Sequence, residues 1–351
     1  MDIAPGGVRI IIAMETSSEG EAQSGVPDQA SDRVWSGIDA AIRKALDARL
    51  GEKYARRRLG IEKDHEAQIF GQGLNFFHIE NLLASRGVIR AVLKSAFLYE
   101  RGRRNAARVT VRTNDVPSPL VPAPFEGFTI LHLSDLHCDI SEAAMAQLVE
   151  LLPSLAYDLC VLTGDYRGET FGPFKPAIAG MREVCARLKG NVYGVLGNHD
   201  TILMVPALEA MGVTMLLNEA VALERSGERV HIAGIDDAHF YRVDNIEKAA
   251  AGFPPGEFSV LLSHTPEIFR QAAHADFDLL LAGHTHGGQI CLPGGTAITL
   301  DSVLPRRMGA GSWVHNEMAG YTSVGAGSSV VPVRFNCAPE VTLHRLRRVP
   351  Q

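Results

Sequence analysis

Short apolar runs that are each followed within three residues by Asp, Asn or His constrain the fold of this chain more than any other feature. Five such runs cover residues 129–133, 159–162, 192–196, 258–262 and 279–282. Runs of this length, separated by helical stretches, are typical of strands buried in a sheet with helices outside it. The stretch 213–234 has the pattern of strands without helices between them, so part of the sheet is expected to be antiparallel. The pattern predicts an α/β (α+β) fold with mixed sheets.

Helices are expected between these strands, and two further strands are expected to close the chain. The predicted helices cover 141–152, 176–188, 203–211, 245–251 and 266–274, and the closing strands lie near 320–325 and 340–346. In such folds, functional side chains collect in the loops just beyond the ends of the strands. The residues that follow each strand are therefore the first candidates for a functional site.

The side chains in these loops are of the types that bind metal ions. The segments are Ser134-Asp-Leu-His137, Thr163-Gly-Asp165, Gly197-Asn-His-Asp200, Ser263-His264 and Gly283-His-Thr-His286. Any one of them alone is equally well explained by a core histidine or a turn aspartate. Together they offer carboxylate, amide and imidazole groups without a thiolate, in a number too large for one tetrahedral ion. The set predicts a site for two divalent ions that share a carboxylate.

The same segments resemble the calcineurin-like metallophosphoesterase family, whose blocks D-x-H, G-D, G-N-H-D/E, H and G-H-x-H stand here in order within residues 128–346. The resemblance implies a four-layer αββα sandwich around a two-metal site. It implies that one ion is held by Asp135, His137 and His286, the other by Asn198, His264 and His284, with Asp165 bridging them. His199 and Asp200 would be catalytic, His199 near the leaving-group oxygen and Asp200 orienting its neighbours.

The chemistry of such a site agrees with phosphate-ester hydrolysis. Two divalent ions neutralise phosphoryl oxygens and lower the pKa of a bridging water, which gives a hydroxide for in-line attack on a phosphodiester or pyrophosphate bond. A protonated His199 can donate to the departing oxygen. Because imidazoles are among the ligands, Mn, Fe or Zn is expected rather than Ca.

Two further features concern the substrate. Arg167, soon after Asp165, either contacts a substrate phosphate or is a surface arginine. The segments Gly325-Ala-Gly327 and Pro332-Val-Arg-Phe-Asn336 look like those of a subgroup that contains membrane-associated phosphoesterases and relatives of UDP-2,3-diacylglucosamine pyrophosphohydrolase. Those relatives commonly begin with a transmembrane helix, whereas this chain has a basic amphipathic stretch instead.

The N-terminal third is expected to be accessory to a catalytic domain over 128–351. Residues 1–30 are rich in Gly, Ser, Glu, Gln and Pro, which predicts disorder. Residues 31–112 are predicted to be a helical, basic amphipathic segment, with one helix starting at Ser31 or Asp32 and a second near 79–100. Four prolines then predict a linker over 113–127.

The stretch 86–112 holds eight basic residues and one acidic residue, in a chain whose net charge is −6. Two interpretations stay open for the apolar and basic stretch 70–112. It packs on the catalytic domain with a solvated basic face, or it lies on an anionic membrane surface with its apolar residues in the interface. The negative charge of the whole chain argues against specific nucleic-acid binding.

Cysteine usage and the apolar runs bear on location. Five cysteines without a C-x-x-C pair favour a reducing compartment. The run Val8–Met14 is too short for a secretory signal, and none approaches the roughly 18 apolar residues of a spanning helix. We therefore expect a cytoplasmic protein, or one peripheral on the inner face of the membrane.

Three functions follow from these observations. The leading one is two-metal hydrolysis of a lipid-linked nucleotide such as UDP-2,3-diacylglucosamine, because the stretch 70–112 can admit acyl chains. The second is a phosphodiesterase for cyclic or small nucleotides in solution. The third is a metal-binding scaffold with low activity that engages a partner through its N-terminal third.

Overall fold

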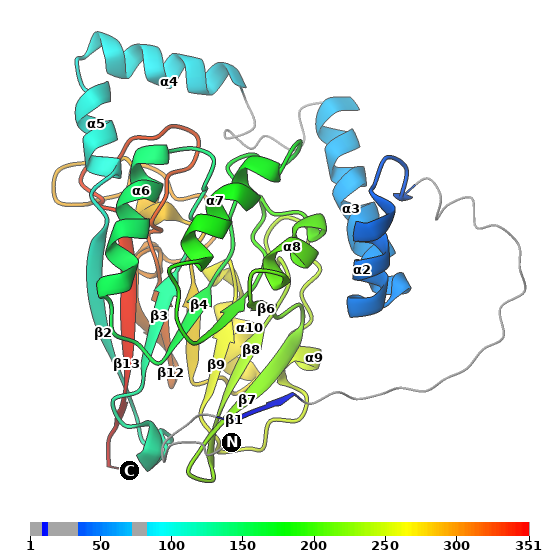
Figure 1. The fold of residues 1–351 in the computed structure, drawn as a ribbon. Helices are drawn as coiled ribbons and strands as arrows, with labels where there is room; N and C mark the ends of the chain where they lie inside the picture. The colour runs from blue at the N-terminus through cyan, green and yellow to red at the C-terminus, as the bar shows by residue number, and fades with distance from the viewer. Residues whose placement is uncertain (1–8, 13–33, 72–82, 351) are drawn as a thin grey trace, which may run out of the picture.

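The computed structural model describes residues 9–12, 34–71 and 83–350 of the 351-residue chain. Within them, two mixed sheets pack face to face, and helices cover the outer side of each sheet (Figure 1). The inner layer between the sheets is apolar and includes Phe125, Phe128, Val161 and Leu281. This arrangement is the four-layer αββα sandwich expected from the sequence.

The six-stranded sheet has the order β2-β13-β3-β4-β5-β6. Its parallel part consists of β3 (Thr129–Leu133), β4 (Leu159–Leu162), β5 (Asn191–Gly194) and β6 (Val213–Met215). The strand β13 (Glu340–Arg348) runs antiparallel to β3 and parallel to β2 (Thr110–Ser118). Every residue of β3 and β4 is buried, which explains why their sequences are apolar without alternation.

The seven-stranded sheet has the order β1-β7-β8-β9-β10-β12-β11. Its parallel strands are β8 (Glu228–Gly234), β9 (Ser259–Leu262), β10 (Leu279–Ala282) and β12 (Met318–Thr322). Antiparallel partners are β7 (Glu219–Arg225) on β8, β1 (Arg9–Ile12) on β7 and β11 (Gly311–His315) on β12. The antiparallel part expected within 213–234 is thus confirmed by the β7–β8 hairpin.

The outer helices are short and lie where the alternating pattern predicts them. The six-stranded sheet is covered by α6 (Glu142–Leu151), α7 (Lys175–Cys185) and α8 (Val205–Glu209), and the seven-stranded sheet by α9 (Ile246–Ala250) and α10 (Phe269–His274). The helix α6 begins after Ser141, whose hydroxyl accepts from the amide of Ala144 as an N-cap. Single 3-10 turns include η4 (Ile202–Met204), directly before α8.

Among the described residues, the helices α2, α3, α4 and α5 come before β2 and form two pairs that differ in their contacts. The helices α2 (Ala40–Leu50) and α3 (Glu52–Gly71) pack beside α8 and bury Leu46, Ala55 and Leu59 in the same core cluster as α6–α8. The helices α4 (Leu83–Ser95) and α5 (Tyr99–Ala106) lie at one end of the sandwich, where α4 projects above it (Figure 1). No helix in the described part of the chain is long and apolar enough to cross a membrane.

Several expectations for the N-terminal part need correction. Residues 110–118 form β2, not a linker, and Pro117 is tolerated because β2 is the edge strand of its sheet. Residues 9–12 form β1, while the rest of the segment predicted to be disordered, up to residue 30, lies outside the described residues. The helix predicted over 79–100 is interrupted at Phe97, whose φ of 56° is left-handed. Its first four residues also lie outside the described residues.

Candidate metal centre

The predicted site residues meet at one end of the sandwich, because the carboxyl ends of β3, β4, β5, β9 and β10 point to the same end. The nine residues predicted as ligands or catalytic groups are all buried: Asp135, His137, Asp165, Asn198, His199, Asp200, His264, His284 and His286. The first six of them follow strands of the six-stranded sheet, and the last three follow strands of the seven-stranded sheet. The cluster therefore joins the two sheets at their common end.

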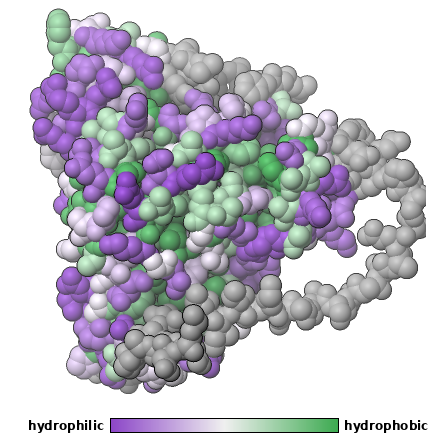
Figure 2. Space-filling view, viewed as in Figure 1, coloured by the Kyte–Doolittle hydropathy of each residue, from purple (hydrophilic) through white to green (hydrophobic). Residues whose placement is uncertain are grey.

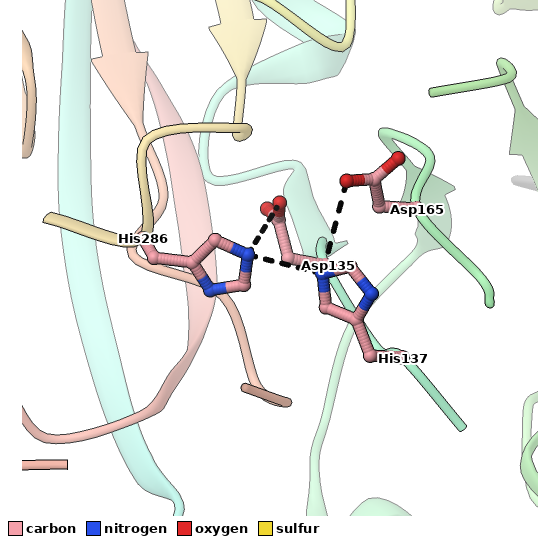
Figure 3. Close-up of side chains that lie close together, drawn as sticks. All are labelled: Asp135, His137, Asp165 and His286. Carbon is pink, nitrogen blue, oxygen red and sulfur yellow. Dashed lines mark hydrogen bonds and ion pairs between the residues drawn. The ribbon is translucent and has the colours of Figure 1, made fainter. Parts of the chain in front are cut away.

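One group within the cluster consists of Asp135, His137, Asp165 and His286 (Figure 3). The Nε2 atoms of His137 and His286 lie 3.0 Å apart, and His286 Nε2 is 3.4 Å from an Asp135 oxygen. His137 Nε2 is 3.7 Å from Asp165 Oδ2. Because His137 Nδ1 donates to the carbonyl of Arg167 at 2.8 Å, the Nε2 lone pair of the neutral ring faces the other members of the group.

A second group shares Asp165 and adds His264, His284 and Asn198. His264 Nδ1 donates to the carbonyl of Thr163 at 2.7 Å, so its Nε2 also faces inward, 3.3 Å from Asp165 Oδ2. His284 Nδ1 lies 3.2 Å from that His264 nitrogen. The side-chain oxygen of Asn198 is 2.9 Å from His264 Nε2 and 2.8 Å from His284 Nδ1. Two groups of nitrogen and oxygen atoms thus meet at one carboxylate.

This donor set fits two divalent cations. Ring nitrogens that face each other at 3.0 and 3.2 Å, with no thiolate nearby, are suited to ions between them. Burial lowers the pKa of His137 and of His286, which favours the neutral imidazole that binds metal. Although burial alone would raise it, the imidazoles of His264 and His199 hold the pKa of Asp165 well below its usual range. The buried cluster is therefore suited to a dinuclear metal site.

The backbone of this cluster is held in a sparsely populated conformation. Five of its members have positive φ angles: Asp135 (51°), His137 (40°), Asp165 (57°), His284 (71°) and His286 (50°). A non-glycine residue in this region costs about 1–3 kcal/mol and persists only when its surroundings fix it. Here the loops fix each other, because the amide of His137 donates to the carbonyl of Asp165 at 3.0 Å.

Gly283 shows how closely the two sheets approach at this point. A Cβ atom at Gly283 would lie 1.9 Å from the Ser134 hydroxyl and 2.3 Å from an Asp135 oxygen. The amide of the next residue, His284, donates to the Asp135 carboxylate at 3.1 Å. Glycine is required here because the β10 loop touches the β3 loop directly.

His199 and Asp200, both in the β5 loop, have different contacts. The His199 ring is next to the cluster, with Nε2 3.9 Å from Asp165 Oδ2 and Nδ1 3.2 Å from the Thr170 hydroxyl. The Asp200 carboxylate instead accepts from the amides of Asp165, Tyr166 and Gly197 at 2.8–2.9 Å. Burial raises the pKa of Asp200 to about 7. Its contacts are those of a residue that joins the β4 and β5 loops.

Arg167 is neither a surface residue nor directed at the cluster. Its side chain is buried, and each of its three guanidinium nitrogens donates to a backbone carbonyl: that of His199, that of Thr170 and, at 3.0 Å, that of Gly172. The prediction of a surface arginine is wrong, and these bonds support a role in holding the His199 loop rather than a substrate phosphate.

Two residues beside the cluster were not predicted. Arg334 is fully buried and donates to the carbonyls of Val324 and Gly327 at 2.6 and 2.7 Å, with the same nitrogen 3.2 Å from His286 Nδ1. His239 follows β8, and its ring centroid lies 4.2 Å from that of His284. The rule that functional residues follow strand ends, if applied to β8, would have found His239.

Comparisons with known proteins agree with this geometry. The calcineurin-like phosphoesterase family model matches residues 128–288. An uncharacterized metallophosphoesterase of Bacillus subtilis (strain 168), YkoQ, is 32% identical over 260 residues, which is 71% of this chain and 94% of that protein. The chain belongs to the calcineurin-like metallophosphoesterase family and is a metal-dependent phosphoesterase.

Two other relatives indicate the range of the family. Phosphodiesterase YaeI of Escherichia coli (strain K12) is 29% identical over 236 residues, covering 62% of this chain and 82% of that protein. A transmembrane protein with a metallophosphoesterase domain from Bos taurus is 29% identical over 284 residues. That match covers 74% of this chain but only 62% of the Bos taurus protein.

Proposed function

We propose that the chain hydrolyses a phosphodiester or pyrophosphate bond with two ions of Mn, Fe or Zn. The observation that carries this proposal is the position of Asp165, whose carboxylate belongs to both groups of inward-facing ring nitrogens. In this proposal, Asp135, His137 and His286 hold one ion, Asn198, His264 and His284 hold the other, and Asp165 bridges them. The YaeI relative, named a phosphodiesterase, supports diesters over monoesters.

The protein's own groups would complete the chemistry. Two bound divalent ions supply positive charge for the phosphoryl oxygens and acidify a water nucleophile. The His199 ring, whose Nε2 is 3.9 Å from Asp165 Oδ2, would protonate the departing oxygen. Asp200 and Arg167 keep that ring in place through the β4 and β5 loops, because both bond to backbone atoms of these loops.

The substrate we propose is lipid-linked, for example a nucleotide such as UDP-2,3-diacylglucosamine. The strand β2 runs antiparallel to the direction of β3, so the helix α5 that precedes β2 lies at the end of the sandwich where the metal centre lies. The amide of Arg334 donates to Gly102 of α5, and Asn105 of α5 donates to the Arg334 carbonyl, both at 3.0 Å. Because the Arg334 side chain contacts His286, Arg334 links α5 to the site.

The occupant we propose for the outer face of α4 is an anionic membrane surface. Val88, Val92 and Phe97 are 61%, 60% and 92% exposed, which leaves an apolar row without a partner in the described chain. Arg90 and Lys94 lie on the opposite side of the helix at four-residue spacing. Hydrophobic and hydrophilic residues accordingly alternate over the upper left of Figure 2. An apolar row with a basic face is typical of helices that lie in a membrane interface.

Turnover of a substrate panel together with metal analysis tests the chemical proposal. We expect about two equivalents of Mn, Fe or Zn per chain, and faster hydrolysis of diesters or nucleotide pyrophosphates than of monoesters. A clear preference for monoesters would contradict the proposal. Faster turnover of a cyclic nucleotide than of any acylated substrate would favour the phosphodiesterase that acts on small nucleotides.

Flotation with vesicles that contain anionic lipid tests the membrane proposal. Removal of residues 1–112 is unsuitable, because it would delete α2, α3 and part of β2. The full chain is instead compared with Val88→Asp/Val92→Asp, and with Val314→Asp, which alters a valine of β11 that is 63% exposed. The double variant should lose flotation and the Val314 control should keep it. If the chain and both variants float equally, or none floats, the membrane proposal is wrong.

A further inference from the structure

The helix α3 carries a pair of opposite charges in the protein interior. Arg58 is fully buried and Glu62 is 6% exposed, although charged residues are rarely buried to this degree unless they are paired. The two residues are four apart, so they lie on one face of the helix, and Arg58 Nη1 is 2.7 Å from Glu62 Oε1. The face that carries them packs against the catalytic sandwich, where η4 contacts α3.

Glu62 holds the chain directly after His199 and Asp200. Its Oε1 accepts from the amide of Ile202 at 2.8 Å, and its Oε2 accepts from the Thr201 hydroxyl. Ile202 is the first residue of η4, so its amide has no partner within the turn and depends on Glu62. The far end of the β5 loop is thus fixed by a carboxylate that α3 contributes.

Arg58 holds the loop that follows β8. Its Nε is 3.0 Å from Asp236 Oδ2, which also accepts from the Tyr54 hydroxyl at 2.8 Å. The neighbouring Asp237 carboxylate accepts from the amides of His239 and Phe240 at 3.2 and 2.8 Å. This loop carries His239, whose ring contacts that of His284. Burial opposes the Arg58 charge, but Asp236 and Glu62 outweigh it and hold the pKa above its usual value.

We infer that Arg58 and Glu62 are positioning residues for catalysis, so that α3 is a component of the active site and not an accessory helix. Glu62 fixes the loop that carries His199, and Arg58 fixes the loop that carries His239. The expected effect on catalysis rests on the proposed phosphoesterase function, whereas the expected effect on the mobility of the two loops does not. Loss of either charge should loosen both loops while the metal-binding side chains stay unchanged.

Arg49 of α2 supplies a matched control. It also joins the N-terminal helices to the sandwich through charges, with Nη2 2.7 Å from Glu219 and Nε 2.9 Å from Glu209. Neither of these carboxylates belongs to the loops that carry His199 or His239. A purely structural effect of weakened helix docking should therefore appear in Arg49→Gln as well, whereas a positioning effect should not.

The test compares Glu62→Gln, Thr201→Val and Arg49→Gln in the full chain loaded with Mn²⁺. Hydrogen exchange of residues 197–204 should become faster in the Glu62 and Thr201 variants and stay unchanged in the Arg49 variant. Values of kcat should fall about 10- to 100-fold in Glu62→Gln, because small misplacements of catalytic groups have effects of this size. KM should change little, and bound metal should be retained.

The outcomes separate this inference from the proposed function. Unchanged exchange and kcat in folded Glu62→Gln and Thr201→Val would overturn it, as would equal changes in Arg49→Gln. If Glu62→Gln does not fold, Thr201→Val decides alone; it removes the bond to Glu62 together with the weaker 3.3 Å bond that the Leu203 amide donates to the same hydroxyl. If the wild-type chain hydrolyses no phosphate ester, the proposed function fails, and the exchange of residues 197–204 still decides the positioning role.

Discussion

The helix pairs α2–α3 and α4–α5 both belong to the segment predicted as one accessory element, yet they use charge in opposite ways. On α3, Arg58 and Glu62 are buried and bonded to loops of the catalytic sandwich. On α4, Arg90 and Lys94 are exposed on the side of the helix opposite an exposed apolar row. A buried charge must be paired and so fixes geometry, whereas an exposed charge remains available to a partner. The charges of α3 therefore fix that helix to the catalytic sandwich, whereas the charges of α4 are exposed at the protein surface.

The largest effect is expected from a substitution at the metal centre, and not from one in either helix pair. Asp165→Asn removes the carboxylate shared by both metal groups, and several kcal/mol of transition-state stabilisation should be lost with it. We expect metal content to fall and the rate to fall at least about 1,000-fold, since each 1.36 kcal/mol is about tenfold. Vesicle flotation should be unchanged. Retention of both metals with a rate near that of the wild type would contradict the assignment.

The next effect concerns the stability that the buried charges of α3 contribute. Arg58→Ala leaves Glu62 and Asp236 buried without their partner, which should lower the free energy of unfolding by about 3–5 kcal/mol. Arg90→Ala on α4 should change it by less than about 0.5 kcal/mol, as surface substitutions usually do. Urea unfolding of both variants measures the difference. Similar values for the two would remove the distinction between the helix pairs.

A smaller effect should appear in membrane binding. Each basic residue near an anionic surface contributes about 1 kcal/mol, so Arg90→Gln/Lys94→Gln should weaken vesicle binding roughly 30-fold. The effect should shrink in high salt because the interaction is screened. The matched control is Lys53→Gln/Arg57→Gln, an exposed basic pair at the same spacing on α3. Equal losses from the two pairs would mean that charge in general, and not α4, governs binding.

The smallest effect distinguishes α2 from α3. Arg49 makes two ion pairs, but its side chain is 31% exposed and solvent screens the interaction. Arg49→Ala should therefore lower the free energy of unfolding by about 1 kcal/mol or less, measured in the same urea experiment. If Arg49→Ala lowered the free energy of unfolding as much as Arg58→Ala, burial would not be what distinguishes Arg49 from Arg58.

The catalytic sandwich could be predicted because its signals are local in the sequence. The strands β3, β4, β9 and β10 are apolar runs, and the polar residues after them meet wherever such strands lie parallel. The resemblance of these segments to the family's motifs then predicted one particular fold around the cluster. The left-handed angles of Asp135 and His284 could not be predicted, since contacts between distant loops impose them.

The parts that escaped prediction depend on contacts between distant segments. The helix α3 has no clear apolar stripe, because its buried face includes Arg58 and Glu62. The four prolines led to the prediction of a linker where β2 lies, because the edge position of β2 is known only from the strand order of the sheet. The buried position of Arg167 could not be predicted, because it depends on three backbone carbonyls that accept from its guanidinium, two of them from its own loop.

The position of β13 has a consequence for how this chain folds. The last strand lies between β2 and β3, so Val341 pairs with Val111 and Leu343 with Leu131. During synthesis, β2 and β3 therefore keep unpaired edges until residues 340–348 have left the ribosome. Pairings between such distant segments form slowly, and open strand edges invite aggregation in the meantime. Loss of residues 340–348 should leave a chain in which β2 and β3 have no strand between them, so that the six-stranded sheet cannot form.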